Sequence, residues 1–195
     1  SITFSDPPGM SYPPRPKWLT LCVILVLGSY ESYYRLKDLI DTVVRPEYVP
    51  MVRKFLADYD IGLARFLVQG VDVWLNNPRR PREASGTSGM KVPLNLGINL
   101  SVLDGWWPEA WDGTNGWAIG TEADYATPEE QDADDAESLY RVLEQQVVPD
   151  FYTRDASGVP TAWVARARRS LETCLRPFHT HRMVGEYARD WYVTA

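Results

Sequence analysis

The sequence is poor in the residues that build metal and redox sites, and it has no excess of positive charge. Its two cysteines, Cys22 and Cys174, lie far apart and form no metal or redox motif, so we expect no metal site and reduced thiols in a cytoplasmic protein. The net charge is −6, which predicts neither nucleic acid nor an anionic membrane as a partner. Any phosphate bound here must therefore be held locally.

Long apolar runs and internal repeats are also lacking. The most apolar stretch, Trp18–Gly28, is shorter than the about 20 residues of a membrane span. It also lacks the charged lead and the cleavage site of a signal peptide, so we expect a buried strand. Tryptophan and tyrosine, by contrast, are abundant, with eight and eleven copies. Aromatic rings stack on sugar rings as well as filling cores, so these counts are compatible with carbohydrate binding without deciding it.

Strands alternate with helices between residues 18 and 120, which predicts an α/β lobe with a parallel sheet. We expect strands at 18–28, 71–75, 98–104 and 117–119, and helices at 31–45 and 58–70. Residues 1–17 are proline-rich and predict an irregular arm. Residues 121–195 predict a helical tail that packs on the lobe, with helices at 136–147, 161–175 and 179–192 after an acidic loop.

The segment EASGTSGMK, residues 83–91, is too polar and too rich in glycine for a core strand. It follows a predicted strand, and we expect MKVPLNLG after it to open a helix. Backbone N–H groups of residues 86–89, the hydroxyls of Thr87 and Ser88, and about half a positive charge from a helix N-terminus would favour an anion there. The P-loop spacing GxxxxGK[ST] is absent, so the segment predicts another kind of phosphate site.

Lys91 lies three residues past Ser88, about one helical turn, so its ammonium can reach back over the same segment. A lysine near fixed positive dipoles loses its proton more easily, and a neutral amine can form a Schiff base. A phosphate next to an aldehyde partner indicates pyridoxal phosphate. A solvated surface lysine is the alternative that the residues alone leave open.

Three stretches together carry a family resemblance: GVDVWLNNPRRPREASGTSGMK, INLSVLDG, and GWW followed by DGTNGWAIG. From about residue 36 onward the chain resembles the α-glucan phosphorylase family, also called glycogen or maltodextrin phosphorylase, and most of all its shorter bacterial and archaeal branch. The resemblance implies two Rossmann-like domains of the GT-B type with pyridoxal 5'-phosphate in the cleft between them. It also implies cleavage of α-1,4-glucan by inorganic phosphate, with the phosphate group of the cofactor taking part in proton transfer.

The same resemblance implies roles for individual residues. Lys91 would bind the cofactor aldehyde and serve as the catalytic lysine, Gly86 and Thr87 would hold the cofactor phosphate, and Tyr59 would lie beside the cofactor. The hydroxyls of the transferred glucose would contact Glu83, Ala84, Ser85 and Gly86. Tyr59 as plain core and Glu83 as a charge at a helix N-terminus are the alternatives.

The chain also departs from the family. The complete enzyme is several times longer and has an N-terminal domain that is missing here, and residues 1–35 do not match its basic segment for substrate phosphate. Pro93 is tolerable only in a first helical turn. We therefore expect a C-terminal lobe that does not catalyse alone, and oligomerisation stays open.

Two other functions remain open at this point. One is the lobe of a nucleotide-sugar glycosyltransferase, which would not need Lys91 for an aldehyde. The other is a truncated glucan-binding or interaction module that uses four tryptophans, Trp106, Trp107, Trp111 and Trp117. Three arginines, Arg79, Arg80 and Arg82, precede the EASGTSGMK segment. They either raise the local positive potential or form a solvated basic loop, and we assign them no role.

Overall fold

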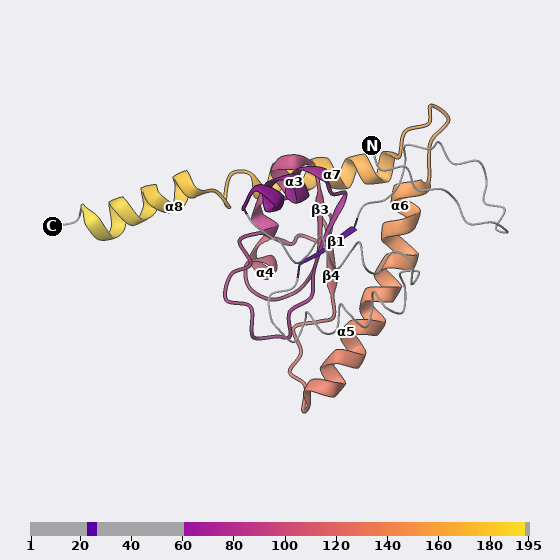
Figure 1. Ribbon diagram of the computed structural model, residues 1–195, viewed down its shortest axis with the longest axis horizontal. Helices are drawn as coiled ribbons and strands as arrows, with labels where there is room; N and C mark the ends of the chain where they lie inside the picture. Colours follow the sequence, from indigo (N-terminus) through magenta and orange to yellow (C-terminus); the bar gives the residue numbers. More distant parts are fainter. Residues whose placement is uncertain (1–22, 27–60, 194–195) are drawn as a thin grey trace.

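The computed structural model describes residues 23–26 and 61–193. Its centre is a four-stranded parallel sheet in the order β1-β2-β3-β4 (Figure 1). The strands are β1 (Val23–Val26), β2 (Val73–Asn76), β3 (Ile98–Val102) and β4 (Trp117–Ile119). The predicted α/β class is thus confirmed. The order of the four described strands across the sheet is their order along the chain, and it does not include the reversal of strand order that marks a complete Rossmann fold. The Rossmann-like lobe therefore stays a prediction.

One face of the sheet carries the main apolar core. Alternate residues along a strand point to the same face, and here they are valine, leucine, isoleucine and tryptophan. The helices that cover this face are α5 (Pro128–Val142), the π-helical segment η3 (Leu143–Val147), α6 (Val148–Tyr152) and α7 (Thr161–Cys174). Figure 1 shows α5 and α6 as one long rod beside the sheet. The buried cluster between sheet and helices contains Val73, Leu75, Ile98, Leu100, Val102, Trp117, Ile119, Val142, Val147, Phe151, Trp163 and Ala167.

The opposite face of the sheet is more polar, and it supports the segment that carries EASGTSGMK. Trp74 packs there with Val68 of α3 (Ile61–Gly70) and with Val92. Asn99 and Ser101 of β3 alternate with the core residues of that strand, so they lie on this opposite face, and both are buried. The predicted helix at 58–70 is therefore confirmed over α3, whereas its first residues lie outside the described part.

The acidic stretch after β4 is helix rather than loop for most of its length. The helix expected at 136–147 begins at Pro128 instead, because Thr127 and Glu130 form a capping box: the N–H of each donates to the side chain of the other, at 3.3 and 3.2 Å. Proline suits the first helical position, and the acidic residues of the first turn favour the positive end of the helix dipole. The interpretation of this stretch as a capping loop was thus wrong beyond Thr127.

The helix that we expected MKVPLNLG to open does not form. In its place two single 3-10 turns follow each other, η1 (Gly89–Lys91) and η2 (Pro93–Asn95). Pro93 stands at the first position of η2, where its missing N–H removes no helical bond, and Leu96 then turns left-handed with φ 62°. Turns this short carry no helix dipole of the expected strength, so that part of the argument for an anion site fails.

The chain ends in a helix that leaves the rest of the molecule. α8 (Thr180–Tyr187) and the π-helical segment η4 (Ala188–Tyr192) have no buried residues, and Figure 1 shows α8 projecting away from the sheet. Among residues 23–26 and 61–193, no helix is both long and apolar enough to cross a membrane. The predictions for residues 1–17, the helix at 31–45 and Tyr59 fall outside the described residues, and the division into domains stays a prediction.

Candidate functional site

The turn that follows β3 holds the first half of the EASGTSGMK segment. The carboxylate of Asp104 accepts two backbone N–H groups, from Glu83 at 2.9 Å and from Gly105 at 2.9 Å. The N–H of Trp106 donates to the carbonyl of Ser85 at 2.9 Å. Two chain segments that lie far apart in the sequence are thereby joined at the carboxyl end of β3, where ligands collect in α/β sheets.

Glycine is required on both sides of this junction. Gly105 has φ +59°, and a Cβ there would lie 2.7 Å from the carbonyl oxygen of Ser85. Gly86 has φ +78°, and a Cβ there would lie 3.3 Å from Trp106 and 3.6 Å from Glu83. L-residues with a side chain rarely adopt this backbone conformation, so both positions favour glycine, and at Gly105 the missing Cβ also lets the two backbones approach closely.

The second half of the segment is fastened to β3 itself. Asn99 donates its side-chain amide to the carbonyl of Gly89 at 3.1 Å, in a buried position. The N–H of Gly89 donates to the carbonyl of Gly86 at 3.1 Å and closes a tight turn over residues 86–89. This N–H is therefore used within the chain, contrary to the expectation that all four amides of the turn would face an anion.

Lys91 bends back over this turn. Its Nζ donates to the carbonyl of Thr87 at 2.9 Å, and both side chains are exposed. The carbonyl of Lys91 accepts the side-chain amide of Asn95 at 3.0 Å. The ammonium thus lies over the 86–89 turn, as the sequence spacing predicts, and its exposure fits the alternative of a solvated surface lysine as well.

The predicted site residues other than Tyr59 are neighbours in the sequence, and the structure adds the contacts that anchor them. Glu83, Ala84, Ser85, Gly86, Thr87 and Lys91 lie on one continuous stretch, anchored at Asp104 and Asn99, whereas Tyr59 is not among the described residues. Sequence reasoning missed the anchors. The signal for Asp104 was present in INLSVLDG, one of the stretches that carried the resemblance, but its contact with Glu83 depends on the return of the chain across the sheet.

The tryptophan-rich loop is core rather than surface. Trp106, Trp107 and Trp117 are 4%, 0% and 2% exposed, and Trp111 alone among the four reaches 36%. Trp107 begins the short helix α4 (Trp107–Ala110) and packs against Trp106 with ring centroids 5.2 Å apart. The sugar platform of four tryptophans is therefore wrong for three of its members, since buried rings cannot stack on a ligand.

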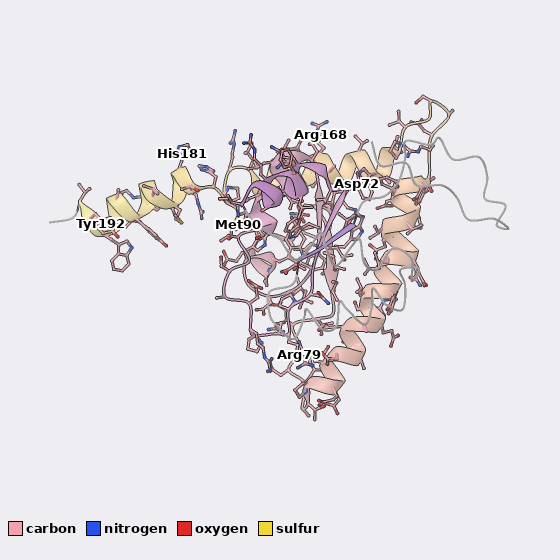
Figure 2. All side chains as sticks on the ribbon, viewed as in Figure 1. Asp72, Arg79, Met90, Arg168, His181 and Tyr192 are labelled. Atoms are coloured by element: carbon pink, nitrogen blue, oxygen red, sulfur yellow. The ribbon has the colours of Figure 1, made fainter. Side chains whose placement is uncertain are left out.

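The arginine loop after β2 is tied to the segment after β4. Arg79 forms a two-pronged ion pair with Asp132 of α5, at 2.8 and 2.6 Å, and is only partly exposed. Arg80 donates to the carbonyls of Thr121 and Ala123 at 3.4 and 3.5 Å. Figure 2 shows Arg79 beside the start of α5, far from Met90 at the other end of the same loop. The interpretation as a purely solvated loop is therefore wrong for Arg79.

One carboxyl near these arginines titrates unusually. Burial, and after it the negative charge of Asp134, raise the pKa of Asp135 to about 6, while Arg80 acts in the opposite direction. The carboxyl of Asp135 lies against Gly120, whose N–H donates to Ser138 at 2.9 Å. The carboxyl of Asp135, with a pKa of about 6, is therefore largely ionised at neutral pH and becomes protonated as the pH falls below that value.

Comparison with known proteins places this parallel α/β lobe among glycosyltransferases. The chain is 48% identical over 162 residues to a glycogen phosphorylase of Mycobacterium tuberculosis, covering 82% of this chain and 19% of the relative. It is 46% identical over 160 residues to a maltodextrin phosphorylase of Thermococcus litoralis, covering 82% and 18%. With a glycogen phosphorylase of Aquifex aeolicus the identity is 45% over 138 residues, covering 71% and 20%.

No family model matches the chain, but these relatives agree with one another. The chain belongs to the α-glucan phosphorylase family, and the resemblance predicted from its motifs is confirmed. It spans about one fifth of the length of the curated relatives that it matches.

Proposed function

We propose that this chain is the C-terminal lobe of a GT-B α-glucan phosphorylase and that it binds pyridoxal 5'-phosphate through Lys91. The observation that carries the proposal is the position of the Lys91 ammonium, 2.9 Å from the Thr87 carbonyl and above the turn 86–89. An amine held beside an exposed turn of glycine, serine and threonine suits a small ligand with an aldehyde and an anionic group.

The residues present fit this cofactor. A Cβ added at Gly86 would lie 3.3 Å from the ring of Trp106, so a side chain there would crowd that ring. The backbone of Gly86 is therefore what can line the site. The hydroxyl of Thr87 and the amides near it are donors for a phosphate, although the N–H of Gly89 is already used within the turn. When bound, the cofactor would supply a phosphate group that exchanges a proton with the substrate phosphate.

The chain's own contribution is to hold and orient the sugar. The carboxylate of Glu83 is an acceptor suited to sugar hydroxyls, and Asp104 fixes the backbone of Glu83 at 2.9 Å. The Ser85 carbonyl is already occupied by the Trp106 N–H, so Ser85 would offer its hydroxyl. Positioning of this kind supplies much of the rate in enzymes that work by orientation.

Covalent trapping tests the proposal. The 195-residue chain is mixed with pyridoxal phosphate, reduced with borohydride and digested, and we expect the pyridoxyl label on Lys91. The other three lysines, Lys17, Lys37 and Lys54, serve as internal controls in the same digest. Lys91→Arg keeps the charge but should lose the label at this position, because a guanidinium does not condense with the aldehyde under these conditions.

Equal labelling of all four lysines would show that the aldehyde reacts without a built site. Absence of a label at Lys91 would favour the other enzyme class, a nucleotide-sugar glycosyltransferase lobe, which has no use for an amine there.

We also propose that the isolated chain does not catalyse phosphorolysis. A cleft needs two walls, and the chain spans about one fifth of its curated relatives, so glucan and inorganic phosphate would lack much of the surface that aligns them. The partner implied is the N-terminal domain of the same enzyme. Incubation of the chain with pyridoxal phosphate, glucan and phosphate should release no glucose 1-phosphate, and measurable turnover would contradict this.

A further inference from the structure

The ring of Trp106 lies against the turn of residues 86–89. A Cβ added at Gly86 would lie 3.3 Å from Cδ1 of this ring, and a Cβ added at Gly89 would lie 3.0 Å from its Nε1. The pyrrole edge of the indole therefore runs along the turn from Gly86 to Gly89. The ring also packs on Trp107 and Phe178, with centroids 5.2 and 5.1 Å apart, so the core fixes the indole N–H at the Gly89 end of the turn.

This N–H is unpartnered but not sealed. Within the described residues, the Nε1 of Trp106 makes no hydrogen bond, whereas the Nε1 of Trp107 donates to the carbonyl of Trp117 at 3.2 Å. Trp74 and Trp117 differ in another way, because their Nε1 atoms are buried completely and have no partner. The Nε1 of Trp106 is not among those sealed atoms although the residue is only 4% exposed, so an atom of the size of a water oxygen can reach it.

Glycine at position 89 keeps the N–H uncovered. The backbone of Gly89 is not in the left-handed region, so its conformation does not require glycine. A Cβ there would instead lie 3.0 Å from Nε1 of Trp106 and 2.9 Å from Oδ1 of Asn99. Any larger residue at this position would therefore crowd the indole N–H and close it off from a ligand.

The turn around this N–H is rich in donors. In the part of the chain that the structure describes, the backbone N–H groups of residues 86–88 have no partner. The Thr87 side chain is exposed, and the Lys91 ammonium lies over the turn. One carboxylate is near, since Oε1 of Glu83 lies 3.6 Å from the Cβ position of Gly86, at the end of the indole edge away from the N–H. An indole N–H can only donate, so a ligand that satisfies these groups must bring acceptors, and a phosphate group brings several on one atom.

We propose that the indole N–H of Trp106 is a further donor of the phosphate site at this turn and bonds an oxygen of the phosphate group held there. The inference rests on the phosphate site proposed above, but not on the bond between Lys91 and an aldehyde. The same chemistry fits inorganic phosphate and the phosphate ester of pyridoxal phosphate, and separate titrations with the two compounds distinguish these sources.

The indole ¹H–¹⁵N signal of Trp106 reports this bond directly. The eight indole signals of the ¹⁵N-labelled 195-residue chain are assigned, and inorganic phosphate is then titrated against chloride at matched ionic strength. We expect a saturable shift of the Trp106 signal with phosphate and none with chloride. Pyridoxal phosphate should shift the signal as well, whereas pyridoxal, which lacks the phosphate, should not. A shift with pyridoxal phosphate but not with inorganic phosphate would identify the cofactor as the source.

Trp106→Phe keeps a ring in the core and removes the N–H. It should weaken phosphate binding about tenfold, the loss of one hydrogen bond to a charged acceptor, measured on the backbone amides of residues 86–88. Trp111→Phe makes the same chemical change at a ring that is 36% exposed, and it should leave the affinity unchanged. Labelling of Lys91 by pyridoxal and borohydride should be equal in the two variants. If Trp106→Phe does not fold, the signal of the unchanged chain still decides.

The inference is overturned if neither inorganic phosphate nor pyridoxal phosphate shifts the Trp106 signal, even where borohydride labels Lys91. It is overturned as well if chloride or pyridoxal shifts the signal as strongly as the phosphate compounds do, or if Trp106→Phe binds phosphate as tightly as Trp111→Phe. A shift with phosphate in a chain whose Lys91 takes up no more label than the other lysines would support this inference and contradict only the bond to the cofactor aldehyde.

Discussion

Trp107→Ala is expected to lower the free energy of unfolding by about 3–5 kcal/mol, the range for removing a large buried ring. The side chain of Trp107 is 0% exposed. Its Nε1 donates to the carbonyl of Trp117 at 3.2 Å, and a Cβ on Gly116 would lie 2.7 Å from its ring. The ring therefore joins α4 to β4, and its removal leaves a cavity between them.

Urea unfolding of the 195-residue chain, followed by circular dichroism, measures this effect. Trp191→Ala is the matched control, because Trp191 is 78% exposed and exposed substitutions usually change stability by less than about 0.5 kcal/mol. Trp107→Phe keeps a ring but removes the N–H donor, and it should fall between the two. A Trp107→Ala variant as stable as the Trp191→Ala variant would show that this loop is not part of the core.

Gly105→Ala should destabilise the chain by about 2–4 kcal/mol, from two separate causes. An alanine in the left-handed conformation, here φ +59°, costs about 1 kcal/mol or slightly more. Its Cβ would also lie 2.7 Å from the carbonyl oxygen of Ser85 and 2.9 Å from the side chain of Glu83, and forced contacts of this kind typically cost about 1–3 kcal/mol. The Ser85 carbonyl is part of the backbone, so it cannot move away from the added Cβ without shifting the candidate site.

Gly113→Ala isolates the first cause. Gly113 has φ +84° but no atom within 4 Å of an added Cβ, so this variant should lose only the conformational part, about 1 kcal/mol. Comparing the two variants in the same unfolding experiment gives the cost of the contact between residues 85 and 105. If both lost equal stability, the close packing of the turn after β3 on the EASGTSGMK segment would be contradicted.

The local elements were largely predictable because their signals are local. The strand at Val73–Asn76 and the helix at Thr161–Cys174 agree with the patterns read from apolar spacing. The start of α5 was missed although Thr127 and Glu130 form a capping box, since the acidic run of residues around it is typical of loops as well. Two short 3-10 turns, at Gly89–Lys91 and Pro93–Asn95, stand where a helix was expected. Pro93 and the left-handed Leu96 interrupt the segment, and the helix propensity of its other residues does not overcome them.

The sequence by itself determined the class of fold, the family and the stretch that carries Lys91, because periodicity, turn residues and motifs are written along the chain. Only the tertiary structure decided that Asp104 holds Glu83, that three of the four tryptophans are buried, and that Arg79 pairs with Asp132. These contacts join residues from about twenty to more than fifty positions apart. Such pairs meet because parallel strands return their loops to one edge of the sheet, and no local pattern records which side chains will face each other there.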